Sequence, residues 1–275
     1  MRGVLATQFG ALVRFYVWAA LFLPPGAVLG AWLATGPGEP WASRAVIAHV
    51  LLNVVGWIGL TVLATVLTLF AAMLRTKLPP GAVVLAQRTL PVSAGATALA
   101  AAGTLAGLRP LVVVLLLVVS LSVGAVLLSM AQLAWQKPPA SYGSWATLCA
   151  MAWLAVALIA LVTAVAGSDS WPQTATRLGW LVPPFTIGLV AQVLTAALSY
   201  LLPVVLRGGP RVTRAMNYEF DRGLGWRLVV LNLGVLLFSL PVPSLVKVAG
   251  SMLGLVGLAS SLPLAARAVL ISRRA

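Results

Sequence analysis

The sequence has few of the residues from which most enzyme sites are built. Its 275 residues include one cysteine, Cys149, one histidine, His49, and only four acidic residues. A single cysteine excludes a disulfide within the chain, and one histidine excludes a bis-histidine metal site within one chain. The acidic residues lie in connections between apolar segments, so no carboxylate pair is placed for hydrolysis in a pocket.

Charge is also scarce, and most of it is positive. Charged residues make up 8% of the chain and hydrophobic residues 61%, and 18 Lys and Arg against four Asp and Glu give a net charge of +14. Soluble domains contain about 25% charged residues, so this composition predicts a membrane protein. A nucleic-acid partner is not expected, because the charges lie between long apolar runs and not over a polar surface.

Eight apolar runs are long enough to be transmembrane helices. A helix needs about 20 apolar residues to cross roughly 30 Å of hydrocarbon. The predicted spans are residues 15–34, 45–74, 91–108, 110–135, 145–167, 178–206, 228–246 and 248–271. We therefore expect an all-α polytopic helix bundle that forms one membrane-embedded domain over residues 1–275.

The distribution of Lys and Arg predicts the orientation of these spans. Positive residues resist translocation and concentrate in cytoplasmic loops. With the N-terminus inside, only Arg44, Arg109, Arg177 and Lys247 of the 18 fall outside, and the other 14 fall inside. This bias predicts a multi-pass protein of the cytoplasmic membrane with both termini inside. Contact with lipid headgroups follows, at about 1 kcal/mol for each basic residue near an anionic surface.

The second span carries the clearest set of polar side chains within the predicted hydrocarbon region. With Gly56, they recur every three or four residues, as His49, Asn53, Gly56, Trp57, Thr61, Thr65 and Thr68, so a regular helix places them on one stripe that faces protein. His49 lies about 8 Å below the outer border at 1.5 Å per residue. A neutral imidazole there could bind haem iron or copper, relay a proton, or hydrogen-bond to a neighbouring helix. All of these interpretations stay open.

Two later spans repeat this ambiguity between a cavity and a helix contact. Gln192 and Ser199 lie in the sixth span and Asn232 in the seventh, where they either line a cavity or hydrogen-bond between helices. Pro183 and Pro184 predict a bend near the outer end of the sixth span.

The longest inner connection, residues 207–227, is rich in arginine. We expect it to begin a short interfacial helix after Gly208, Gly209 and Pro210 break the preceding span. Its arginines either contact lipid headgroups or pair with Glu219 and Asp221. The candidate headgroup ligands are Arg207, Arg211 and Arg214.

Three stretches carry a resemblance to a family of polytopic actinobacterial membrane proteins. They are AHVLLNVVGWIGLTVLATVLTLFAAMLRTKL at 48–78, LGWLVPPFTIGLVAQVLTAALSYLLPVVLRGGP at 178–210 and LNLGVLLFSLPVPS at 231–244. Members of that family often carry a multicopper-oxidase (cupredoxin) domain after the membrane region. The resemblance implies a role linked to copper or respiratory chemistry, with a redox or cupredoxin-type partner on the outer face.

A more distant resemblance joins the second span to haem-copper oxidase subunit I. In that family a histidine near the outer start of the second helix binds a low-spin haem, and His49, followed by Asn53 and by Gly56 with Trp57, is similar to it. The resemblance implies haem b at His49. The later histidines that complete the haem and copper sites have no counterpart here, so oxygen reduction is not expected.

Three functional interpretations follow. The first is a non-catalytic membrane subunit or domain of a respiratory or copper-linked redox system, with one haem near His49. The second is a membrane protein that handles a lipid or another small molecule along a path past Asn53, Gln192 and Asn232. The third is a scaffold in which these polar groups make only helix–helix hydrogen bonds.

Overall fold

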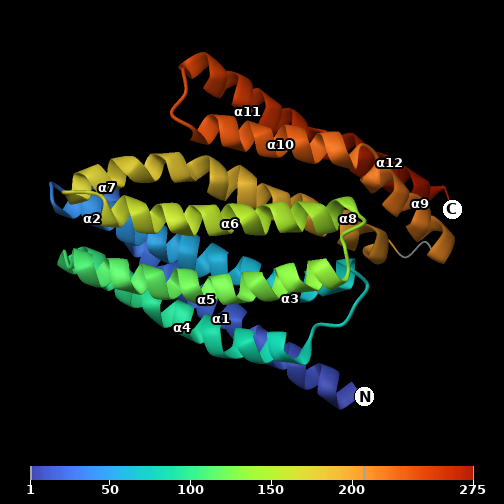
Figure 1. Ribbon diagram of the computed structural model, residues 1–275, viewed down its shortest axis with the longest axis horizontal. Helices are drawn as coiled ribbons and strands as arrows, with labels where there is room; N and C mark the ends of the chain where they lie inside the picture. Colours follow the sequence, from blue (N-terminus) through green and yellow to red (C-terminus); the bar gives the residue numbers. More distant parts are fainter. Residues whose placement is uncertain (1, 207–208, 275) are drawn as a thin grey trace. The chain divides into compact units, whose positions relative to one another are not determined.

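The computed structural model describes residues 2–206 and 209–274, and all regular secondary structure in these ranges is helical (Figure 1). The helices are α1 (Arg2–Leu33), α2 (Trp41–Val50), η1 (Leu51–Gly59), α3 (Leu60–Met73), α4 (Pro80–Ala106), α5 (Arg109–Gln136), α6 (Tyr142–Ala166), α7 (Trp171–Leu178), η2 (Gly179–Leu181), η3 (Pro184–Ala191), α8 (Gln192–Val205), α9 (Gly209–Asp221), α10 (Leu224–Ser239), α11 (Ser244–Ala259) and α12 (Ser261–Arg273). The segments η1 and η3 are π-helical and η2 is a 3₁₀ turn.

Within the described residues, seven helical runs, some of which join two or three of these elements, are long and apolar enough to cross a membrane. The bent pair of α9 and α10, which meet at 44°, adds an eighth candidate if the two count as one span. Their surfaces carry large exposed apolar side chains, such as Leu21 at 66%, Leu121 at 74% and Leu245 at 81% exposure. Water would not tolerate so many exposed apolar groups, whereas lipid does. The predicted all-α polytopic helix bundle is therefore confirmed.

Two predicted span borders are wrong. The seventh span was expected over residues 228–246, but α10 ends at Ser239, and Pro241 and Pro243 lie in the turn before α11. Proline disfavours a helical residue before it and removes a backbone donor, and the two closely spaced prolines favour the end of the helix here. The third span begins eleven residues earlier than expected, because α4 starts at Pro80 and passes through Pro91.

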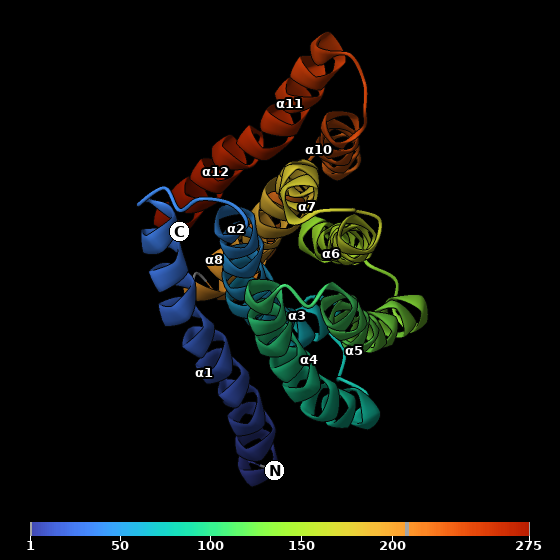
Figure 2. The ribbon, with the colours of Figure 1, turned by 90° about the vertical axis from the view of Figure 1, so that its left-hand side faces the viewer.

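The chain forms two compact units. Unit 1 contains Met1–Thr68, Lys77–Leu133 and Ala157–Leu181, and unit 2 contains Leu69–Thr76, Ala134–Val156 and Val182–Ala275. In unit 1, α1 packs along α2 and η1, and α4 contacts the same pair from another side, as Figure 2 shows. Residues of one long helix, α2–η1–α3, therefore form the centre of unit 1.

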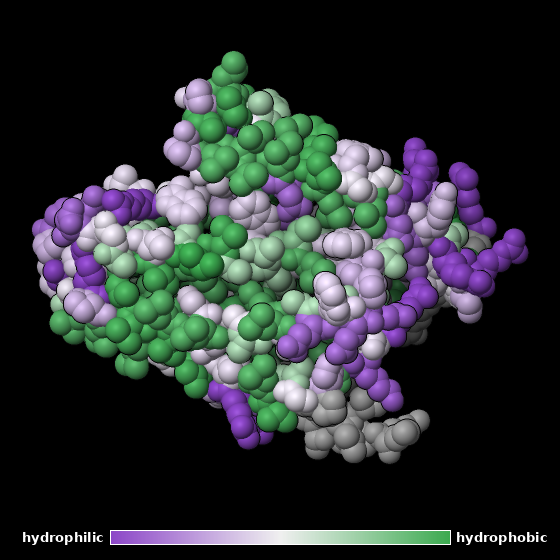
Figure 3. All heavy atoms as spheres, in the orientation of Figure 1, coloured by the Kyte–Doolittle hydropathy of each residue, from purple (hydrophilic) through white to green (hydrophobic). Residues whose placement is uncertain are grey.

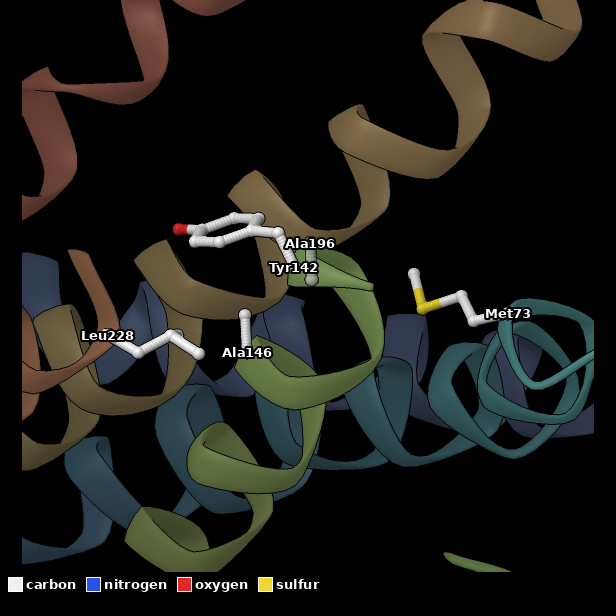
Figure 4. Packing of buried hydrophobic residues seen from close by; sticks show 5 residues of the cluster. All are labelled: Met73, Tyr142, Ala146, Ala196 and Leu228. Atoms are coloured by element: carbon white, nitrogen blue, oxygen red, sulfur yellow. The ribbon is translucent and has the colours of Figure 1, made fainter. Parts of the chain in front are cut away.

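Unit 2 is built around the antiparallel hairpin of α10 and α11, which lie side by side in Figure 1. Farther along the chain, α12 packs against α9. A cluster of Met73, Tyr142, Ala146, Ala196 and Leu228 surrounds the start of α6 (Figure 4). In Figure 3 hydrophobic residues cover the hairpin, and hydrophilic residues gather over α9 and the end of α12. The short helix expected in this connection is α9.

Candidate functional site

The polar stripe of the second span packs against α1 within unit 1. His49 Nδ1 lies 2.8 Å from the carbonyl oxygen of Gly26, a hydrogen bond that needs the proton on Nδ1. Asn53 donates from Nδ2 to the backbone oxygen of His49 at 3.0 Å, and Nδ2 also lies 3.3 Å from the His49 ring. Both polar side chains therefore have hydrogen-bond partners on α1 or on their own helix.

Glycines on the facing helices make this close packing possible. A Cβ atom on Gly26 would lie 2.4 Å from the Asn53 amide, and one on Gly30 would lie 2.9 Å from the His49 ring. At Gly56 the glycine is on η1 and the large side chain is on α1: the ring of Phe22 fills the space that a Cβ on Gly56 would occupy. Small residues let two helix backbones approach closely in a bilayer, so this contact has the features of a structural seam.

The lower part of the predicted stripe does not face protein uniformly. Trp57 is 38% exposed, whereas Gly56 beside it is buried. Both lie in the π-helical η1, which has about one more residue per turn than the 3.6-residue repeat assumed for the stripe. Thr61 donates to the backbone oxygen of Trp57 at 2.7 Å, and Thr65 bonds to Tyr16 of α1 at 2.9 Å. The expectation that Trp57 faces protein is therefore wrong.

Gln192 and Asn232 meet in unit 2. Gln192 is fully buried, and its Nε2 donates to Asn232 Oδ1 at 3.0 Å and to the carbonyl oxygen of Gly188 at 2.9 Å. Trp153 Nε1 also donates to Asn232 Oδ1, at 2.7 Å. The three side chains form a closed network between helices, which supports the helix-contact interpretation over a polar path. Asn53 belongs to unit 1 and takes no part in this network.

Ser199 borders a cavity of about 330 Å³ in unit 2. Its hydroxyl donates to the carbonyl oxygen of Ala196 at 2.7 Å and rests against Gly143, where a Cβ would lie 2.7 Å from it. The walls come from helix ends that the sequence places at the inner side of the membrane. They are Met73, Leu74, Arg75, Lys137, Pro138, Ala140, Ser141, Gly143, Ser199, Tyr200, Asn217, Phe220 and Asp221. We call this cavity the border pocket.

The border pocket combines two cations with neutral hydrogen-bonding groups. Arg75 and Lys137 are exposed at the pocket. Arg75 follows shortly after the end of α3, and its backbone is left-handed, with a φ of 52°. Hydroxyl groups and the Asn217 amide add donors to the same walls. This donor set suits an oxyanion such as a phosphate, because charge-assisted hydrogen bonds from Arg and Lys are strong.

Asp221 adds one carboxylate to the border pocket. Its Oδ1 accepts a hydrogen bond of 2.6 Å from the backbone N–H of Tyr142, which fixes the start of α6 to the end of α9. Burial raises the pKa of the Asp221 carboxyl group, while the Tyr142 N–H and the charges of Arg227 and Arg75 oppose this shift. A carboxylate and two cations therefore share one small cavity.

Arg227 holds the wall behind the pocket together. It is 1% exposed, and its guanidinium group lies 3.8 Å from the centre of the Tyr142 ring. Its nitrogens donate to Ser260 at 3.0 Å, to Ser261 at 2.7 Å and to the carbonyl oxygen of Phe220 at 2.8 Å. These contacts join α6, α9, α10 and the junction of α11 with α12. The cation is buried with all its donor groups close to acceptors or to a ring face.

The three arginines predicted to bind lipid headgroups lie outside this pocket. Arg207 falls outside the described residues. Arg211 and Arg214 are exposed on α9 and are not among the pocket walls, and Arg214 donates to the carbonyl oxygen of Pro210 at 3.2 Å. From the sequence, Arg75 and Lys137 were treated only as charges that orient the spans, and Arg227 was grouped with the other arginines of residues 207–227. Their shared position at inner span ends was the one signal that they could meet.

Unit 1 has a larger cavity of a different kind. An apolar groove of about 860 Å³ lies between α1 and α4, with Leu52 of η1 at its base. Its walls include Trp18 and Phe22 on one side and Ala98 and Ala102 on the other. His49 is not among the walls of any of these cavities. The groove supplies mostly apolar surface, and no charged side chain lies among its walls.

Within residues 2–206 and 209–274, no group of three or more His, Cys, Asp or Glu side chains could hold a metal ion. No protein-family model matches the chain, and no curated protein and no solved structure shows significant similarity to it.

Proposed function

We propose that this protein is an integral membrane protein that binds an amphiphile with a phosphate-bearing headgroup in the border pocket. The observation that carries the proposal is the convergence of Arg75 and Lys137 on one cavity of about 330 Å³. That volume is at the lower end of the range for small-ligand sites. The function belongs to the lipid-handling class that the sequence left open, at a place other than the path past Asn53, Gln192 and Asn232.

The composition of the pocket walls supports an amphiphile over a fully polar ligand. Beside the cations and hydroxyl groups stand the apolar side chains of Met73, Leu74 and Phe220. A phosphate would bond to the cationic side, and the glycerol and first methylene groups of a lipid would contact the apolar side. The pocket also lies at the ends of spanning helices, where lipid headgroups are located.

The location that goes with this proposal is the inner border of the cytoplasmic membrane. All the charged pocket residues belong to connections or helix ends that the distribution of Lys and Arg places inside. A phosphate-bearing headgroup of the inner leaflet would then reach the pocket directly.

The test compares phospholipid retention by detergent-purified protein with that of a pocket variant. Native mass spectrometry should detect bound phospholipid on the wild type. Arg75→Gln combined with Lys137→Gln should lower retention about tenfold or more, because each charge-assisted hydrogen bond contributes about 1.5–3 kcal/mol. The matched control is Arg211→Gln with Arg214→Gln, which removes the same charge from α9 outside the pocket. Equal retention by both variants would contradict the proposal.

A second proposed function is the redox-linked membrane subunit with haem b at His49. One observation favours it: the bond from Nδ1 to the Gly26 oxygen leaves Nε2 as the ring nitrogen with a lone pair, as in many metal-binding histidines. The ring packs against Gly30, however, and borders none of the cavities described above. The residues around His49 therefore fit a haem poorly. The proposed redox partner on the outer face is supported only by the resemblance to the actinobacterial membrane-protein family.

Absorption spectra of purified protein, as isolated and after dithionite reduction, test this second function. A Soret band that shifts on reduction and is lost in His49→Ala would support haem at His49. A featureless wild-type spectrum together with no iron or copper in the same sample would rule it out.

A further inference from the structure

Asp221 gives the border pocket a negative group that a phosphate alone would not explain. A purely anionic ligand next to this carboxylate would be repelled, and the repulsion would reduce what Arg75 and Lys137 contribute. A carboxylate among cations instead suits a ligand that carries both signs of charge.

The carboxylate keeps capacity for a further hydrogen bond. Oδ1 accepts from the Tyr142 N–H, and within the described residues Oδ2 has no hydrogen-bond partner. The nearest buried cation, Arg227, directs its donors to Ser260, Ser261 and the Phe220 carbonyl oxygen and not to Asp221. An ionised carboxylate has about four acceptor positions, so most of those on Asp221 remain for a ligand.

Asn217 and Ser199 border the same cavity and supply neutral acceptor oxygens. A primary ammonium group has three N–H donors, which one carboxylate and two such oxygens would satisfy. A trimethylammonium group has none, so it could not use these acceptors.

We propose that the border pocket selects a zwitterionic headgroup, a phosphate monoanion linked to a primary ammonium, with the phosphate at Arg75 and Lys137 and the ammonium at Asp221. The inference rests on the proposed function and names its ligand class. The matching chemistry is a phosphoethanolamine group, either on a membrane lipid or in a soluble phosphodiester.

The experiment measures bound lipid by native mass spectrometry after exchange with phosphatidylethanolamine, phosphatidylglycerol or phosphatidylcholine of identical acyl chains. The wild type should retain phosphatidylethanolamine about tenfold more than either other lipid, as expected for a charge-assisted hydrogen bond. Asp221→Asn should remove this preference over phosphatidylglycerol. Equal retention of the three lipids by the wild type would overturn the inference.

Two variants separate a specific effect from a general one. Asp221→Asn keeps an acceptor oxygen for the Tyr142 N–H and has nearly the same shape as the native side chain, so the variant should fold. Glu219→Gln is the matched control, because Glu219 pairs with Arg222 at 3.1 Å and does not border the pocket. A control that changed the lipid preference as much as Asp221→Asn would also overturn the inference.

The failure of the proposed function looks different from the failure of this inference. If Arg75→Gln with Lys137→Gln leaves phospholipid retention unchanged, the pocket is not the binding site and both fail. If that variant loses all three lipids while the wild type shows no preference, only the selectivity fails. Soluble glycerophosphoethanolamine, added as a competitor, shows which molecule supplies the phosphoethanolamine group. If it displaces the lipid at equal concentration, the natural ligand is the free phosphodiester. If it does not displace the lipid, the natural ligand is the lipid.

Discussion

Arg227 shows what a charged side chain needs in order to be buried at the border of an apolar bundle. Its guanidinium group is surrounded by two serine hydroxyls, the Phe220 carbonyl oxygen and the face of the Tyr142 ring. Each contact replaces water that the cation loses, so the group stays ionised without a direct salt bridge among the described residues. The side chain thereby fixes four helices of unit 2 at one point.

We expect Arg227→Met to lower the stability of the protein by about 3 kcal/mol, because several charge-assisted hydrogen bonds are lost together. Thermal unfolding in detergent should show a lower Tm than the wild type. The control is Arg222→Gln, whose side chain is 49% exposed and makes only a surface pair with Glu219. Such pairs contribute about 0–1 kcal/mol, so a Tm loss as large as that of Arg227→Met would contradict the assigned role.

At the scale of helices, close approach depends on glycine at a few positions. In the α10–α11 hairpin, a Cβ on Gly234 would lie 2.4 Å from the backbone nitrogen of Gly254 and 2.6 Å from the backbone oxygen of Gly250. These are backbone atoms, which cannot rotate away as a side chain does. The two helices must therefore separate if residue 234 gains a side chain.

Gly234→Ala should destabilise the hairpin by about 1–3 kcal/mol, the usual range for overpacking. Gly254→Ala is the matched control in the same hairpin, because a Cβ at that position meets nothing within 4 Å. Thermal unfolding of the two variants side by side measures the difference. If both substitutions shift Tm equally, the close contact at Gly234 is not what holds α10 to α11.

At the scale of the whole molecule, the distribution of charge predicts the membrane topology, and its exceptions in unit 1 have structural partners. Arg44 donates to the carbonyl oxygen of Leu105 at 3.4 Å and Arg177 to that of Gly167 at 2.6 Å, so each satisfies an oxygen at or just after a helix C-terminus. Arg109 stacks on Trp171 at 4.8 Å. Three of the four cations predicted outside therefore make specific contacts within unit 1.

The predicted orientation can be tested by labelling single cysteines with a membrane-impermeant maleimide in intact cells, after Cys149→Ala removes the native thiol. Gln136→Cys and Thr176→Cys replace exposed residues at opposite ends of the spans. With the N-terminus inside, position 176 should be labelled and position 136 should react only after permeabilisation. The reverse pattern would place the border pocket on the outer face.

The helices and their membrane character were predictable from the sequence. A run of about 20 apolar residues has few stable alternatives to a spanning helix, because its backbone must be hydrogen-bonded internally in lipid. The short helix α9 was also predicted from local signals, since glycine and proline break the preceding span. Asn232 and Gln192 were correctly singled out as polar groups within spans, but whether they bond to each other or border a cavity was left open.

The tertiary structure alone decided which distant residues meet. Arg75, Lys137 and Asp221 come from three separate segments, and no periodicity links positions so far apart in sequence. The π-helical turn of η1 likewise rotated Trp57 out of the stripe that a 3.6-residue repeat predicts. Local pattern determines that a segment is a helix and which of its faces is polar, because both depend on neighbours in the chain. The pocket depends on how the helix ends pack together, and that is fixed only by contacts between residues far apart in the sequence.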